Sequence, residues 1–266
     1  MGLSRWADSP YVGIFVRPRA TIREIVDRDP TDRVIALVLV AAAIVVLTEA
    51  IHGYNYDPTA LTIAGKPIPE MPPHWSQLMK LWGFAIAMLL AVPLLYFNGA
   101  LFRWIGSRLG GTAKAVEVRA ALGWRSVPAI IMILASFVLG FLVPPPSQPV
   151  APVSISSVLT IWRSMLPSMI ILSPLWLWSL IVWLECLSEV HRFSVFLALA
   201  TSLIGYLLLG AAAMVVGAVW GLVGGIASRY THDPYRVVSL MTAVVIMMVF
   251  LANALLWKYS RPHAQN

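Results

Sequence analysis

The chain has 266 residues, of which 59% are apolar and only 12% are charged, and its formal net charge is +7. Soluble domains usually contain about 25% charged residues, because their outer layer faces water. This composition excludes a soluble globular protein of the same length and predicts a single membrane domain with short polar flanks.

The first predicted element is an amphipathic helix in the polar segment 1–33. Pro18 suits its first turn, where a missing N–H costs nothing. Residues 18–27 place two kinds of side chain on opposite faces, Ile22, Ile25 and Val26 against Arg19, Arg23 and Asp27. We expect this helix to lie on the anionic inner leaflet, where each nearby Lys or Arg contributes about 1 kcal/mol. The alternative, which does not exclude the first, is that it packs on the protein's own cytoplasmic loop.

Six apolar stretches follow, and each approaches or exceeds the roughly 20 residues that a helix needs to cross the hydrocarbon core. They cover residues 34–51, 78–105, 126–143, 166–187, 196–223 and 237–257, and a polar tail follows at 258–266. Because a backbone in lipid must satisfy its hydrogen bonds internally, each stretch should be helical. The sequence therefore predicts an all-α, polytopic transmembrane helical bundle of about six spans over residues 34–257, preceded by the amphipathic interfacial helix.

The segments between the spans carry fewer structural signals. Gly110, Gly111 and Thr112 are expected to break the chain before a short amphipathic helix at residues 113–122. The loops at 53–77 and 144–163 are rich in proline, and we expect neither strands nor helices in them.

Most of the 19 Lys and Arg residues lie on the side of the N-terminus. The expected basic face on that side includes Arg17, Arg19, Arg23, Arg103, Arg108, Lys114 and Arg119. Because Lys and Arg concentrate in cytoplasmic segments, we expect both termini inside, in a multi-pass protein of the cell inner (plasma) membrane. If the last two stretches formed a re-entrant pair, both termini would still lie inside, but six full crossings are the favoured alternative.

Ionisable residues within spans are costly in lipid and are therefore candidates for function. Glu49 and His52 share a helical face near the end of the first span, and Lys80 enters the second span at the same level. We expect a Glu49–Lys80 pair there, and we favour a structural role over a proton or substrate path. Glu185 lies at the inner end of the fourth span beside Glu189, His191 and Arg192, which form a charged boundary cluster, and a structural role is again favoured.

Two amides and three glycines are candidates for helix packing. Asn98 and Asn253 can form interhelical hydrogen bonds, which are typically worth about 1 kcal/mol. Gly217, Gly221 and Gly225 recur every four residues on one face of the fifth span, where small residues let helices approach closely. Internal packing is the favoured use of this strip, and the alternative is the interface of a homo-oligomer.

Signatures of enzymes and of nucleic-acid binding are missing from the sequence. The five histidines show no paired-ligand spacing, and neither a GxSxG elbow nor a Walker A loop occurs. We therefore expect no catalytic residue, no metal and no cofactor. The basic charge is explained by membrane topology, so nucleic acid is not an expected partner, whereas the lipid bilayer and unidentified proteins are.

Several short motifs occur in a characteristic order. FVRPRATIREI precedes the first span, the double glycine and WRSVPAI precede the third, and WLWSLIVWLECLSEVHRFSVFLALA joins the fourth and fifth. In this order the chain resembles the Yip-one family (Ypt-interacting protein domain), in its bacterial form, over roughly residues 10–220. The resemblance implies a polytopic helical protein without catalytic residues. Eukaryotic members reside in Golgi and ER membranes and are implicated in Rab GTPase recruitment, but their acidic DLYGP-like lead-in is absent here and a sixth span is added.

Two functions follow from these observations. The favoured one is a non-enzymatic membrane scaffold or adaptor with a trafficking-like role, whose basic cytoplasmic face recruits partners. The alternative is a six-span transporter or permease subunit with Glu49 in a proton or substrate path. Since the third, fifth and sixth spans are almost purely apolar, the sequence favours the scaffold.

Overall fold

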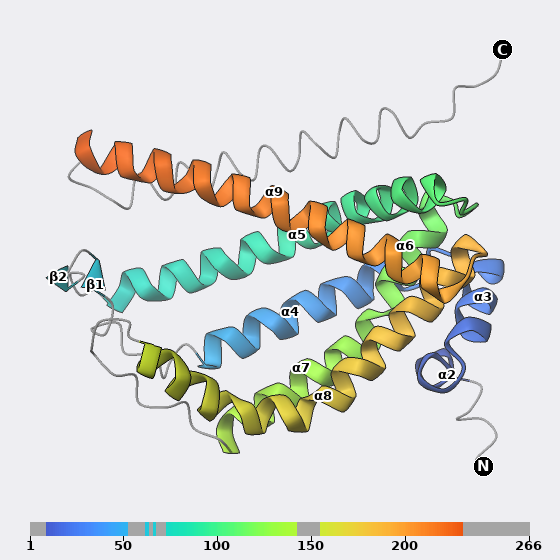
Figure 1. Cartoon of the computed structure of the whole chain (residues 1–266), viewed down its shortest axis with the longest axis horizontal. Coiled ribbons are helices and arrows are strands. Elements are labelled where there is room, and N and C mark those ends of the chain that lie inside the picture. The colour runs from blue at the N-terminus through green and yellow to red at the C-terminus, as the bar shows by residue number, and fades with distance from the viewer. Residues whose placement is uncertain (1–8, 53–61, 64–65, 68–72, 143–154, 231–266) are drawn as a thin grey trace.

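Long apolar stretches become long helices, because only helices satisfy the backbone within one segment in lipid. The computed structural model describes residues 9–52, 62–63, 66–67, 73–142 and 155–230. Its helices are α2 (Pro10–Val16), α3 (Pro18–Arg28), α4 (Val34–His52), α5 (Pro73–Arg108), α6 (Ala115–Trp124), α7 (Ser126–Leu142), α8 (Ile155–His191) and α9 (Val195–Tyr230). The predicted all-helical bundle is confirmed (Figure 1). The predicted span at 237–257 and the tail at 258–266 lie outside the described residues.

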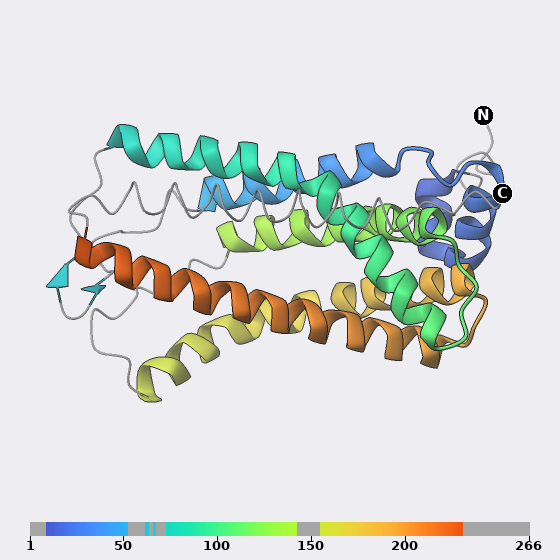
Figure 2. The same cartoon turned by 90° about the horizontal axis from the view of Figure 1, so that it is seen from above.

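The long helices run along one axis, and the short helices gather at one end of it. Figures 1 and 2 show α2 and α3 lying together at this end, with α6 beside them and the turn between α8 and α9 close by. We call this region the packed end, and it comprises α2, α3, α6, the end of α5 and the α8–α9 turn. The opposite end carries the strands β1 (Thr62–Ile63) and β2 (Lys66–Pro67), which pair antiparallel.

Four described segments are long and apolar enough to cross a membrane. They are Gly83–Arg108, Ala115–Gly140, Met169–His191 and Val195–Val219, and the apolar helix Val34–Thr48 is shorter. The prediction of a multi-pass bundle is confirmed by these segments. By length and composition, the described ranges contain four candidate spans and one shorter apolar helix, whereas about six spans were predicted for the whole chain.

The loops bordering α5 and α8 were predicted wrongly. Helix α5 already begins at Pro73 and α8 at Ile155, and a short β-hairpin precedes α5. At about 1.5 Å per residue, the 36 residues of α5 span about 54 Å, well beyond a hydrocarbon core of about 30 Å. Apolar patterning marks only the part of a helix that faces lipid, so it underestimates helices that extend beyond the bilayer.

Buried apolar side chains concentrate at the packed end. They include Ile14, Ile22, Ile25, Phe102, Val118, Trp124, Val182, Trp183, Cys186 and Leu187. Elsewhere the long helices expose large apolar side chains such as Ile170, Trp176, Leu207 and Met214. This division is expected of a membrane bundle, in which lipid covers the apolar faces that a soluble protein would bury.

The predicted chain break at Gly110 is confirmed as a helix stop. Gly110 has a φ of +89°, and the Gly111 N–H donates to the Gly106 carbonyl at 2.8 Å. This is the six-to-one hydrogen bond of a Schellman motif, which needs a left-handed residue just beyond the helix. The same motif ends α8, where Arg192 takes the left-handed conformation at φ 56° and the Phe193 N–H donates to Ser188.

We expect Gly110→Ala to lower the free energy of unfolding by about 1–2 kcal/mol, because a Cβ disfavours the left-handed conformation. A Cβ at Gly110 would meet no described atom within 4 Å, so the cost is conformational rather than steric. Gly83→Ala is the matched control, since Gly83 is equally open but lies within α5, where alanine is the better helix former. Thermal unfolding of both variants in detergent is the measurement. Equal shifts in the two midpoints would contradict this account.

Candidate functional site

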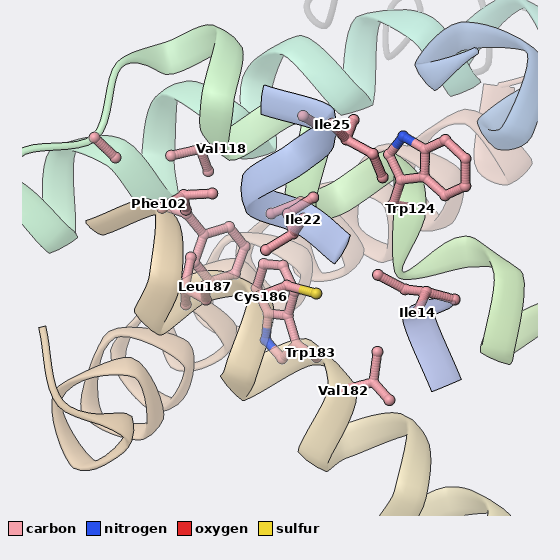
Figure 3. Close-up of a cluster of buried hydrophobic side chains, with 14 of the residues drawn as sticks. Ile14, Ile22, Ile25, Phe102, Val118, Trp124, Val182, Trp183, Cys186 and Leu187 are labelled. Atoms are coloured by element: carbon pink, nitrogen blue, oxygen red, sulfur yellow. The ribbon is translucent and has the colours of Figure 1, made fainter. Parts of the chain in front are cut away.

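Helix α3 is amphipathic as predicted, but its apolar face packs on protein. Ile22 is fully buried and Ile25 nearly so, and both join a cluster supplied by α6 and α8 (Figure 3). Pro18 occupies its first turn, and Arg28 lies in its last turn. The structure therefore shows the alternative in which the helix packs on the protein. Contact with lipid, which this packing does not exclude, stays a prediction. The hydrophobic pattern was right, but it does not identify what covers the apolar face.

Two ion pairs join α3 to α8. The Nε of Arg19 donates to Glu185 Oε2, and the Nη2 of Arg23 donates to Glu189 Oε1. Residues four apart lie on the same face of a helix, so matched spacings of four on both helices bring the two pairs into register. We call these four residues the ion-pair ladder.

The carboxylates of the ladder are less exposed than the arginines. The Glu189 side chain is 13% exposed, whereas that of Arg23 is 66% exposed. Exposed ion pairs contribute about 0–1 kcal/mol, but removing the partner of a buried carboxylate leaves a charge that water cannot fully solvate. The arginines are therefore more important for holding α3 in place than for presenting free positive charge.

A histidine connects two helix turns of the packed end. His191 is 1% exposed, and its ring stacks on Phe193 with centroids 4.9 Å apart and an interplanar angle of 2°. Its carbonyl accepts a hydrogen bond from the Thr112 N–H at 3.2 Å. Glycine is needed beside the ring, because a Cβ at Gly106 would lie 2.5 Å from Nε2 and one at Gly111 would lie 3.0 Å from Cγ. The two turns are thus fixed to each other by one side chain.

Trp124 closes the other side of the packed end. It is fully buried at the end of α6, and its ring lies 5.3 Å from that of Tyr11 on α2.

Arg33 Nη1 donates to the Tyr11 hydroxyl at 3.1 Å, which holds the pKa of Arg33 above its ordinary value. Hydrogen bonds from the Thr31 hydroxyl and backbone N–H hold the pKa of Asp29 below its ordinary value. The connection from α3 to α4 is therefore fixed by charged groups.

A polar cavity of about 520 Å³ lies next to Trp124, between α2, α3 and the start of α4. Its charged lining comprises Arg17, Glu24, Arg28, Asp29, Asp32 and Arg33. Both signs of charge are present, so the cavity does not select a cation or an anion by net charge.

The remaining basic residues of the predicted face differ in their surroundings. Arg103, Arg108 and Lys114 are exposed, and Arg108 lies over the Trp104 ring at 5.7 Å. Arg119 is partly buried, with its guanidinium 4.3 Å from the centroid of Tyr96. Only part of the predicted basic face is therefore available to solvent.

Several predicted site residues lie, wholly or with their side chains, outside the part of the chain that the structure describes. The side chains of Glu49, His52 and Lys80, the surroundings of Gly221 and Gly225, and the whole of Asn253 lie outside the described residues. Asn98 Oδ1 is buried without a hydrogen-bond partner among the described residues, so the expected interhelical bond to this atom is not seen there. A Cβ at Gly217 would meet no described atom within 4 Å.

Other contacting residues were missed in the sequence. The prediction placed Glu189 and His191 in a boundary cluster without identifying a partner for either of them. The shared spacing of four in Arg19–Arg23 and Glu185–Glu189 was a signal for the ladder. Gly205 of α9 was also missed as a close-packing glycine, because a Cβ there would lie 2.9 Å from Cζ of Phe102.

Over the described ranges, no three His, Cys, Asp or Glu residues lie close enough together to hold a metal ion.

Residues 12–217 match the family model of the Yip1 domain. No curated protein and no solved structure matches the chain.

Proposed function

The chain belongs to the Yip1 domain family, and we propose that it is a membrane scaffold or adaptor that uses its packed end to recruit proteins. Membership of this family, together with the apolar helices, makes it a multi-pass membrane protein. The proposal places the packed end in the cytoplasm, at the inner (plasma) membrane, with both termini on that side. The excess of Lys and Arg on the segments of this end supports that orientation.

The observation that carries the proposal is the attachment of α3 to α8. A helix fixed by a buried apolar face and a two-step ion-pair ladder presents its outward side in one orientation. A surface that is already ordered binds a partner at a lower entropic cost than a mobile segment does. Recruitment by the outward side of α2 and α3, together with exposed Arg103 and Lys114, fits this arrangement.

The experiment compares partner capture by the wild type with capture by a ladder variant. In Glu185→Lys/Glu189→Lys, like charges face Arg19 and Arg23, and we expect α3 to detach and proximity labelling of partners from a tag on α2 to fall several-fold. Restoring opposite charges with Arg19→Glu/Arg23→Glu in the same chain should recover labelling. This charge-swapped chain is the matched control, because it substitutes the same helices and pairs opposite charges again.

The same preparation tests orientation and the alternative function. Partners added from outside should bind inverted vesicles, in which the cytoplasmic side faces outward, and not right-side-out vesicles. Binding only to right-side-out vesicles would overturn the orientation. An unchanged set of labelled proteins in the ladder variant would overturn recruitment through α3, and solute flux by the purified protein would instead favour the transporter.

A further inference from the structure

A second cavity lies along α5, where α4 and α9 flank this helix. This groove has a volume of about 590 Å³, within the roughly 300–1,000 Å³ of small-molecule sites. Its walls are apolar for most of their length, and they include Val38, Ala42, Val46, Leu90, Leu94 and Leu209. Its polar lining residues are Asn98, Arg125, Ser126 and Tyr206, and Arg125 donates to the Tyr206 hydroxyl. The groove is therefore amphipathic, like a lipid.

Arg125 is a cation without a carboxylate partner in the described chain. It lies in the turn between α6 and α7, where it donates to the Tyr206 hydroxyl and its guanidinium lies 4.8 Å from the centroid of Trp183. By contrast, Arg19, Arg23 and Arg33 each form an ion pair with a described carboxylate. A partly buried charge without a counter-ion is costly in apolar surroundings, so an anion beside Arg125 would be stabilising.

The donors of the polar lining suit a phosphate or carboxylate. A guanidinium has five N–H donors in a planar fork, and the bond to Tyr206 uses one of them. Asn98 faces the groove with its Oδ1 buried and unpartnered among the described residues. A half-turn of this amide exchanges its oxygen for its nitrogen, which carries two N–H donors. Arg125 and Asn98 thus both line the groove with hydrogen-bonding capacity that the described residues do not use.

We propose that this groove binds one anionic lipid of the surrounding bilayer, with its phosphate on Arg125 and an acyl chain along α4, α5 and α9. The apolar walls favour a lipid over a water-soluble anion, because an acyl chain covers apolar side chains that a small hydrophilic anion would leave without a partner. The groove is bordered by two candidate membrane spans, Gly83–Arg108 and Val195–Val219, so bilayer lipid is the ligand at highest local concentration. This site is independent of the recruitment proposed for α3.

The test uses native mass spectrometry of the full-length protein released from nanodiscs of mixed phosphatidylglycerol and phosphatidylcholine. The wild type should retain one phosphatidylglycerol and little phosphatidylcholine. Arg125→Gln should lower this retention tenfold or more, since the phosphate would lose its charge-assisted hydrogen bonds to the guanidinium. Arg103→Gln is the matched control, because Arg103 is an exposed arginine of α5 that does not line the groove.

A second variant keeps the test meaningful if Arg125→Gln fails to fold. Ala42→Phe fills the apolar part of the groove and leaves Arg125 intact, so it should also lose the lipid. Val40→Phe on the same helix should not, because Val40 is 49% exposed and lies outside the groove. Equal retention of both lipids, displacement of the lipid by inorganic phosphate alone, or a lipid-free dimer in place of a lipid-bound monomer would each overturn the proposal.

Discussion

Trp124→Ala is expected to lower the free energy of unfolding by about 3–5 kcal/mol, the range for removing a buried tryptophan. Trp124 is fully buried and packs between α2, α3 and α6, beside Ile25 and above Ile14 in Figure 3. Its loss would leave a cavity at the point where the short helices meet, and α2 would also lose the ring that contacts Tyr11. Thermal unfolding of the detergent-solubilised protein is the measurement.

Trp176→Ala is the control for this prediction. Trp176 is 63% exposed on the lipid-facing part of α8, so its truncation should change stability little. The two variants remove the same number of atoms and differ only in what surrounds the side chain. Similar losses of stability would contradict a core concentrated at the packed end.

Gly106→Ala should lower the free energy of unfolding by about 1–3 kcal/mol, as expected of an overpacked core. The added Cβ would lie 2.5 Å from Nε2 of His191, and the ring cannot retreat easily because Phe193 stacks on its face. The readout is again the unfolding transition in detergent. The effect should be larger than that of any substitution on the lipid-facing surface.

The double variant Gly106→Ala/His191→Ala distinguishes this steric cause from a general cost of alanine. Without the imidazole ring the added methyl group has space, so the two changes should be coupled by about 0.5–3 kcal/mol. Gly210→Ala serves as the control, because a Cβ there meets no described atom within 4 Å. Strictly additive effects of the two changes would show that His191 does not occupy the space beside Gly106.

The sequence predicted the membrane bundle well because hydropathy directly reflects the solvent around each helix. It also predicted the helix stop at Gly110, since a left-handed cap favours glycine locally. The hydropathy of a helix and the glycine that ends it are both local properties, so a short stretch of sequence is enough to predict them. The starts of α5 and α8 were missed for the same reason, because helix residues outside the bilayer need no apolar pattern.

Contacts between distant segments were beyond the sequence argument. The amphipathic face of α3 was evident, but nothing in residues 18–27 states whether lipid or α8 covers it. The ladder depends on the register of two helices separated by 166 residues in each pair. The position of His191 likewise depends on two glycines of another turn. Such features follow from tertiary packing, which a single sequence does not specify by pattern alone.

The long sequence separation within the ladder also matters during synthesis. Arg19 is made 166 residues before Glu185, which corresponds to about 8–33 s at roughly 5–20 residues per second. During this interval Ile22 and Ile25 have no α8 to pack against, and an amphipathic basic helix in that state binds an anionic membrane surface. The lipid contact expected from the sequence would then belong to the nascent chain, and the finished protein would exchange lipid for α8. The packed end would be completed only after α8 has been made, because α8 supplies both carboxylates of the ladder and part of the cluster around Ile22.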